Sequence, residues 1–201
     1  MNRQRNFIKV LGMVAMLSAV GGSLPAVAAT ASSTPVPLLA QTGADVLFNR
    51  GVQKLQQRDY QGAIADFSAL IERESGNANA YLGRAIAYRN QENYQAALED
   101  YNASLSLNST NANAYLGRGI TKRKTGDDRG AIEDYTQALR YNEDYGQAYY
   151  NRGLSKVELG DLDGAIADFR QAARLYREQE LISYYQDALA RIVELEETRS
   201  R

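Results

Sequence analysis

Apolar and polar positions alternate at a spacing of three and four along most of the chain, which is typical of amphipathic helices that bury one face. In a representative stretch, residues 112–141, a polar turn separates two such apolar stripes. The pattern predicts two short helices that fold back on each other. The first of them carries its stripe on Tyr115, Leu116, Gly119 and Ile120.

The hairpin pattern repeats with a fixed period of 34 residues. The string NANAYLGR stands at 77–84 and again, unchanged, at 111–118. Applying this offset brings whole columns of related residues into register, so the same hairpin is predicted four times. The columns are Gly51, Ala85, Gly119 and Gly153; Ala63, Ala97, Ala131 and Ala165; Ile64, Leu98, Ile132 and Ile166; and Phe67, Tyr101, Tyr135 and Phe169.

Each unit also contains the signals that start and pack a second helix. One polar residue per unit stands where a side-chain oxygen can cap free backbone N–H groups. The small column lets the two helices approach closely, and the aromatic column can pack over it. The expected caps are Asp59, Asn93, Asp127 and Asp161.

Together these columns resemble the tetratricopeptide repeat family. The resemblance implies an all-α fold class, a right-handed α-α superhelix of four helical hairpins. The family's usual proline near the end of each unit is replaced by Ser75, Ser109 and Glu143. The phrase NRG…GAIADF is similar to that of exported cyanobacterial members. The four expected units are 44–77, 78–111, 112–145 and 146–177.

Residues 178–201 are predicted to form a C-terminal capping helix, because a stack of repeats needs a polar end. The alternative is a helix that binds a partner or a second copy of the chain. Three glutamates occupy much of one face. The expected apolar stripe of the other face is Ile182, Tyr185, Leu189, Ile192 and Val193.

Residues 1–29 have the pattern of an export signal. Three basic residues precede an apolar run at 10–24, and small residues would allow cleavage after Ala28 or Ala29. Cleavage would remove three basic residues and no acidic one, which changes the net charge from −1 to −4. The alternative is an uncleaved membrane anchor, although the run is shorter than a membrane span.

Two further predictions concern the export route and the segment that follows the signal. Gln4 stands where a twin-arginine signal has its first Arg, so the general secretory route is predicted and the twin-arginine route is the alternative. Residues 30–43 are rich in Ser, Thr and Pro and are expected to form a flexible linker.

Two charged columns interrupt the apolar stripes of the hairpins. An Arg precedes the small residue of each first helix, and an Asp precedes the aromatic residue of each second helix. Three interpretations remain open: a structural ion pair, solvated surface charges, or an Arg row that binds an acidic partner. Each Asp could bond the Arg of its own unit or of the next. The columns are Arg50, Arg84, Arg118 and Arg152, and Asp66, Asp100, Asp134 and Asp168.

Composition argues against a catalytic or metal-binding site in this protein. The chain has no Cys, His or Trp, which excludes disulfides, thiolate or imidazole metal sites, and Cys or His catalysis. A net charge of −1 argues against nucleic acid as a partner. We therefore expect no enzyme activity, no cofactor and no metal.

The family resemblance implies that the first helices line a concave groove that binds peptides or partner proteins. Its best-known groove for C-terminal carboxylates needs Lys and Asn where this chain has aliphatic or aromatic residues, which argues against cytosolic chaperone tails. A mainly apolar groove with two central arginines suits an apolar partner with some acidic character. The chain's own PVPLL segment is an alternative occupant. The expected lining is Phe48, Val52, Leu55, Leu82, Ile86, Arg89, Leu116, Ile120, Arg123, Tyr150, Leu154 and Val157.

The sequence thus predicts an exported, monomeric scaffold or adaptor for protein–protein or protein–peptide interaction, with no membrane span after signal removal. Its location would be the periplasm, or the thylakoid lumen in a cyanobacterium, and its role the assembly of an envelope or photosynthetic complex. One alternative is an accessory subunit that binds through its convex face or terminal helix. The other is an enzyme with an unrecognised acidic site.

Overall fold

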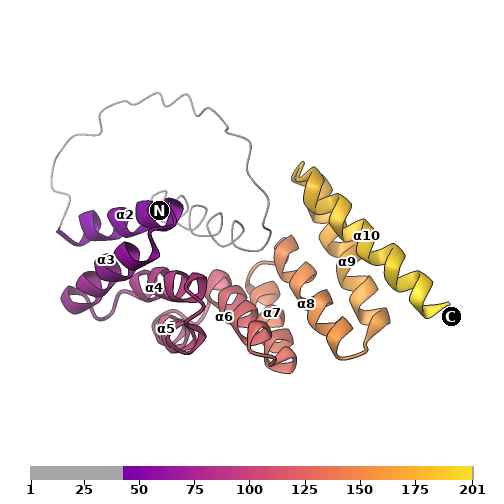
Figure 1. The fold of residues 1–201 in the computed structure, drawn as a ribbon, viewed down its shortest axis with the longest axis horizontal. Helices are drawn as coiled ribbons and strands as arrows, with labels where there is room; N and C mark the ends of the chain where they lie inside the picture. Colours follow the sequence, from indigo (N-terminus) through magenta and orange to yellow (C-terminus); the bar gives the residue numbers. More distant parts are fainter. Residues whose placement is uncertain (1–42, 201) are drawn as a thin grey trace.

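The structure, a computed structural model, describes residues 43–200, which contain α-helices and no strand (Figure 1). The predicted signal and most of the predicted linker lie outside these residues. The first helices of the four units are α2 (Gly43–Gln56), α4 (Ala78–Asn90), α6 (Ala112–Lys124) and α8 (Gly146–Glu158). The second helices are α3 (Tyr60–Arg73), α5 (Tyr94–Leu107), α7 (Asp128–Tyr141) and α9 (Leu162–Glu178). A final helix, α10, spans Ile182–Arg199. The predicted all-α class is confirmed.

Every second helix begins at its expected cap. The Asp59 carboxylate, for example, accepts a hydrogen bond of 2.9 Å from the backbone N–H of Gly62. Asn77 and Asn111 cap two of the first helices in the same way. Because an Asx cap also turns the chain, these asparagines form the turn at which the family usually has a proline.

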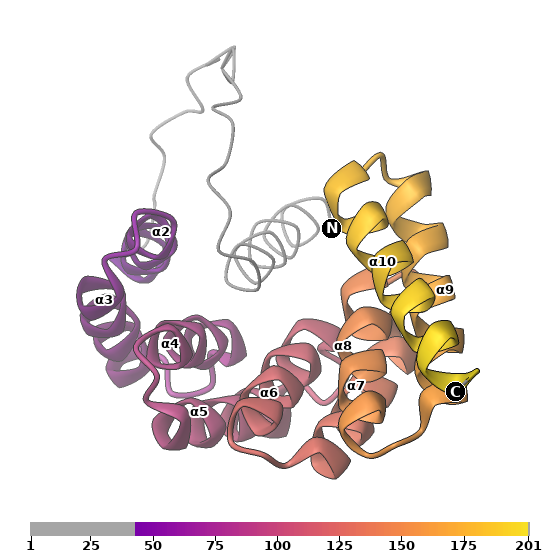
Figure 2. The same ribbon diagram turned by 45° about the vertical axis from the view of Figure 1, so that its right-hand side comes forward.

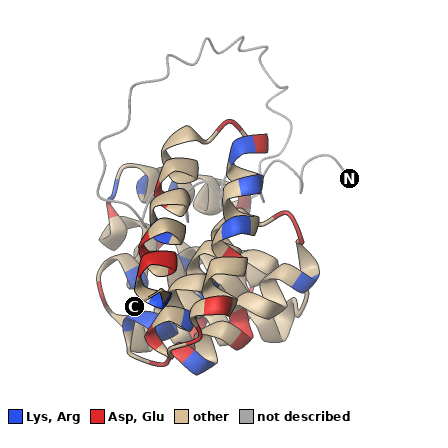
Figure 3. Cartoon of the chain, turned by 90° about the vertical axis from the view of Figure 1, so that its right-hand side faces the viewer, with Lys and Arg blue, Asp and Glu red and all other residues tan. Residues whose placement is uncertain are grey.

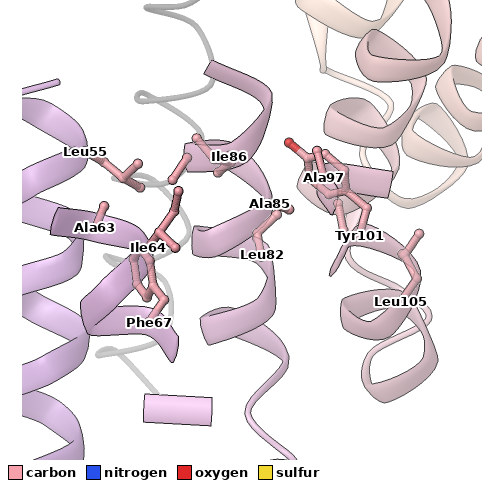
Figure 4. Packing of buried hydrophobic residues seen from close by; sticks show 12 residues of the cluster. Leu55, Ala63, Ile64, Phe67, Leu82, Ala85, Ile86, Ala97, Tyr101 and Leu105 are labelled. Atoms are coloured by element: carbon pink, nitrogen blue, oxygen red, sulfur yellow. The ribbon is translucent and has the colours of Figure 1, made fainter. Parts of the chain in front are cut away.

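The aromatic rings of the first two second helices fill spaces between successive units. The buried Phe67 ring lies so close to Gly51 and Gly83 that a Cβ at these positions would be 2.9 and 2.4 Å from it. Tyr101 has the same relation to Gly117, at 2.5 Å. Figure 4 shows Phe67 pointing across from α3 toward the face of α4. The core is therefore continuous from one hairpin to the next.

The hairpins stack side by side into a curved solenoid (Figure 2). In this view α2 and α4 lie on the inside of the curve relative to α3 and α5. Basic and acidic positions are interspersed along the helices in the cartoon of Figure 3. None of the helices within residues 43–200 is both long enough and apolar enough to cross a membrane.

The last helix packs on α9, but not with the predicted stripe. Ala188, Ile192 and Leu195 are its buried residues, whereas Ile182 and Val193 are 54% and 55% exposed. Leu189 is also exposed. The prediction was therefore wrong for three of its five positions. The small Ala188 packs with Ala172, Ala173 and Tyr176 of α9, so the contact face turns away from the bulkier row.

Candidate functional site

The two charged columns form an ion pair within every unit. The Nε atom of Arg118 donates to Asp134 Oδ2 at 2.9 Å, and its Nη2 atom donates to Oδ1 at 2.6 Å. The same two-point geometry joins Arg84 to Asp100 at 2.7 and 2.8 Å. Such a fork fixes the relative height of the two helices of a hairpin. The remaining two pairs are Arg50 with Asp66 and Arg152 with Asp168.

The remaining guanidinium nitrogen reaches back to the preceding unit. Arg118 Nη1 donates to Asn102 Oδ1 at 2.7 Å, which links α6 to α5. Arg84 and Arg152 make the equivalent bonds to Ser68 and Thr136 at 3.0 and 3.1 Å. Each Asp thus bonds the Arg of its own unit, and in units two to four the same Arg also bonds the preceding hairpin. We call these four linked pairs the Arg–Asp ladder.

A lysine that the sequence analysis did not single out reinforces three of the four pairs. Lys122 Nζ lies 3.0 Å from Asp134 Oδ2, and Lys54 and Lys156 occupy the same place in units one and four. In unit two the position holds Tyr88, whose ring centroid is 5.9 Å from the Arg84 guanidinium. The lysine was predictable from the sequence, because Lys54, Lys122 and Lys156 stand in one column at the 34-residue period.

The carboxylates of the ladder are buried, with 2–5% of each Asp exposed. The hydrogen bond from Arg50, helped by Lys54, holds the pKa of Asp66 below its usual range. The hydrogen bonds to Asp100 and Asp134 raise the pKa of Arg84 and Arg118. These charges are therefore satisfied inside the protein, which favours the structural interpretation over an Arg row that reads a partner.

The predicted groove residues are all at least half-buried. None of the twelve is fully exposed. Leu55, Leu82, Ile86, Arg89, Leu116 and Ile120 are buried, and the other six are half-buried.

Another helix already covers the predicted groove residues of unit four. Tyr150, Leu154 and Val157 pack against the cluster that contains Ile192 and Leu195 of α10. The Tyr150 hydroxyl also donates a short hydrogen bond to Asp187. The sequence predicts a groove at these three residues, whereas α10 lies against them as the next repeat would.

No group of three or more acidic, His or Cys side chains within residues 43–200 is arranged to hold a metal ion.

Comparison with protein families agrees with this repeat structure. The tetratricopeptide repeat model matches residues 48–112 and 116–180, which together make up more than half of the chain. Comparison with curated protein sequences gives no match.

Solved structures show the same fold at low sequence identity. MamA 41-end from Desulfovibrio magneticus RS-1 is 18% identical, with a TM-score of 0.63 over 81% of this chain and 99% of that one. YrrB, described as having an unusual peptide-binding site, is 20% identical, with a TM-score of 0.58 over 76% and 86%. The first repeat domain of Spaghetti (RPAP3), solved with an HSP90 peptide, is 24% identical, with a TM-score of 0.57 over 58% and 93%.

Proposed function

The chain belongs to the tetratricopeptide repeat family, and on this premise we propose that it is a scaffold or adaptor that binds a protein or peptide partner and catalyses no reaction. Two neighbours of the same fold are described with a peptide or a peptide-binding site, which supports this proposal. The observation that carries it is the curved stack of first helices, whose predicted lining residues in units one to three are apolar except for Arg89 and Arg123. We infer that the partner is an apolar segment with some acidic character.

A surface variant can test binding at this concave face. Val52 is half-buried, so Val52→Glu places a charge at the surface without filling the core. Ile86 and Ile120 are buried, and a Glu there would disturb folding instead. After affinity capture and mass spectrometry identify a partner, Val52→Glu should weaken its binding at least about 10-fold, measured by titration calorimetry.

A matched variant on the terminal helix separates this proposal from the accessory-subunit alternative. Ile182, Leu189 and Val193 form an exposed apolar row on α10, which favours that alternative as a second candidate. Leu189→Glu should leave partner binding unchanged if the concave face is the site. Loss of binding with Leu189→Glu, and not with Val52→Glu, would assign the function to the terminal helix.

We propose further that the protein is exported and acts as a monomer in the periplasm, or in the thylakoid lumen of a cyanobacterium, where it assists assembly of an envelope or photosynthetic complex. The basic start, apolar run and small residues of segment 1–29 support export. Protein isolated from its native cells should therefore begin at Ala29 or Thr30 by N-terminal sequencing and have the light-scattering mass of one chain. An intact Met1 terminus would contradict cleavage.

A further inference from the structure

A completely buried alanine marks the point where each later first helix packs on the unit before it. It is the third residue of α4, α6 and α8, and it shares a buried cluster with the preceding second helix. The pairs are Ala80 with Leu70, Ala114 with Tyr101, and Ala148 with Ala138. The alanine therefore identifies the side of a first helix that contacts the preceding unit.

Ala188 occupies the same point in α10, at the end of the array (Figure 1). It is completely buried and shares a cluster with Ala172 of α9. Ala172 stands 34 residues after Ala138 and is its copy in unit four. The contact between α10 and α9 thus repeats the contact between α8 and α7, so α10 lies where the first helix of a fifth unit would lie.

A first helix also has a second contact side, toward the second helix of its own unit. In α8 this side includes Tyr149 and Gly153, which stand one and five residues after Ala148. Tyr149 packs against the cluster that contains Ala172 of α9. A Cβ on Gly153 would lie 3.0 Å from the ring of Phe169, which is also in α9. A distance of one and five residues from the alanine therefore leads to the side that holds the unit's own second helix.

In α10 this second side is apolar and exposed. The residues one and five places after Ala188 are Leu189 and Val193, which are 39% and 55% exposed. Ile182, seven residues before Leu189, continues the row by two helical turns and is also exposed. None of the helices within residues 43–200 covers this row, so α10 has the neighbour of a first helix on one side only.

We propose that this row binds an amphipathic helix of a second partner protein, which takes the place that the second helix of a fifth unit would have. The proposal goes beyond binding at the concave face, because it gives the adaptor two separate binding surfaces. The packing inside the array predicts the chemistry of the bound helix.

The partner helix must bring a small residue to Val193. Units one to four have Gly or Ala at the equivalent position, and an aromatic ring of the second helix packs over it. Val193 fills this space from α10, so an aromatic side chain opposite it would clash. An exchange of sizes, with Ala or Gly on the partner, keeps the two helices at the same separation.

The partner helix needs no buried acid, but it should have a basic first turn. In units one to four, an Arg stands immediately before the small position and binds a buried Asp. α10 has Ile192 there, and this side chain is buried in a cluster with α9. Glu197 is exposed one turn after Val193, where an antiparallel second helix would begin. A Lys or Arg in the partner's first turn would meet this negative charge.

A second copy of the chain fits this row less well. Its own row would bring Ile, Leu or Val to Val193, and none of these is small. Three partly exposed side chains also offer much less surface than the about 800 Å² that each partner of a standard-size interface buries. This area suits reversible binding of one helix and is too small for a stable dimer.

Two peptides with the α9 sequence test this site on the full chain. Both span residues 161–178 and are held helical by a staple between positions 167 and 171, which are exposed in α9. The small-residue peptide carries Phe169→Ala, whereas the aromatic peptide keeps Phe169. Fluorescence anisotropy of the labelled peptides measures their binding. The substitutions common to both peptides are Asp163→Lys and Asp168→Leu.

The wild-type chain should bind the small-residue peptide at least about 10-fold more tightly than the aromatic peptide. Val193→Ala gives α10 the residue that unit two has at this position, so it should reverse the preference. Val193→Glu should weaken binding of the small-residue peptide at least about 10-fold. Leu159→Glu is the matched control, because Leu159 is 47% exposed and lies outside α10, and it should leave binding unchanged.

The site is removed if neither peptide binds the wild type, if Val193→Glu binds undiminished, or if Val193→Ala does not reverse the preference. Loss of binding in Val52→Glu would place the peptide at the concave face instead. The scaffold function stands in these cases, because its own partner is measured separately. A light-scattering mass of two chains that Val193→Glu reduces to one would make a second copy the occupant. Should a variant not fold by circular dichroism, the two peptides compared on the wild type decide alone, and equal affinities are contrary to the proposal.

Discussion

Arg84→Ala is expected to lower the free energy of unfolding by about 3–5 kcal/mol, because it leaves the carboxylate of Asp100 buried without its ion-pair partner. Asp100 is 5% exposed, and its bound guanidinium is only partly open to solvent. Arg118→Ala should cost less, about 1.5–3 kcal/mol, because Lys122 remains 3.0 Å from Asp134. The two positions are equivalent in the repeat, so the lysine accounts for the difference.

Denaturant melts of matched variants measure this difference. Tyr88→Lys supplies unit two with the lysine of the other units and should reduce the cost of Arg84→Ala to that of Arg118→Ala. Replacing Arg84 and Asp100 together by Leu should be nearly neutral, since no buried charge is then left unpaired. Equal losses for both Arg variants, with no rescue by Tyr88→Lys, would mean that the lysine does not compensate for the missing Arg, and losses near zero for both would mean that the ion pairs do not stabilise the fold.

The ladder shows how far a repeated sequence predicts structure. The fixed offset places every Arg and Asp at a known position in its hairpin, so the existence of two facing columns follows from the sequence alone. Whether Asp134 bonds Arg118 depends on the relative rotation of α6 and α7, which one hairpin's pattern does not determine. The second bond, from Arg118 to Asn102, depends on how α6 lies on α5 and is likewise a property of the stack.

The end of the array was the least predictable part. In α10 the sequence offers two apolar faces, and the bulkier one looks like the buried one. The structure buries Ala188 and Leu195 instead and exposes Val193, because the approach to α9 favours a small residue at the contact. The same packing places α10 against Leu154, which the family resemblance assigned to a groove. A single terminal helix has no second copy against which its pattern can be compared.

The polar residues in the central units were predictable in part. Arg89 and Arg123 stand out in the sequence as the only charges among the expected lining residues. The matching change from Phe to Tyr at residues 101 and 135 is equally visible, yet a Tyr in an aromatic packing column has an ordinary explanation. What the structure adds is the complete burial of both side chains, which raises the pKa of each phenol.

Gly83→Ala is expected to lower the free energy of unfolding by about 1–3 kcal/mol, although Ala favours a helix over Gly by about 1 kcal/mol. The added Cβ would lie 2.4 Å from the Phe67 ring. That ring is completely buried and also lies against Gly51, where a Cβ would be 2.9 Å away. The ring therefore has no free direction in which to move, and α3 and α4 must separate.

Two further variants identify the clash as the cause. Gly76→Ala adds the same methyl group in open space and at an ordinary φ, so it should be neutral or stabilise the fold by up to about 1 kcal/mol. Phe67→Leu shortens the opposing side chain, and in its presence Gly83→Ala should cost clearly less than it does alone. The difference is a coupling energy between two residues in adjacent units. Simple additivity of the two substitutions in denaturant melts would show that the ring does not join the hairpins, and the cohesion of the array would then rest on the Arg–Asp ladder.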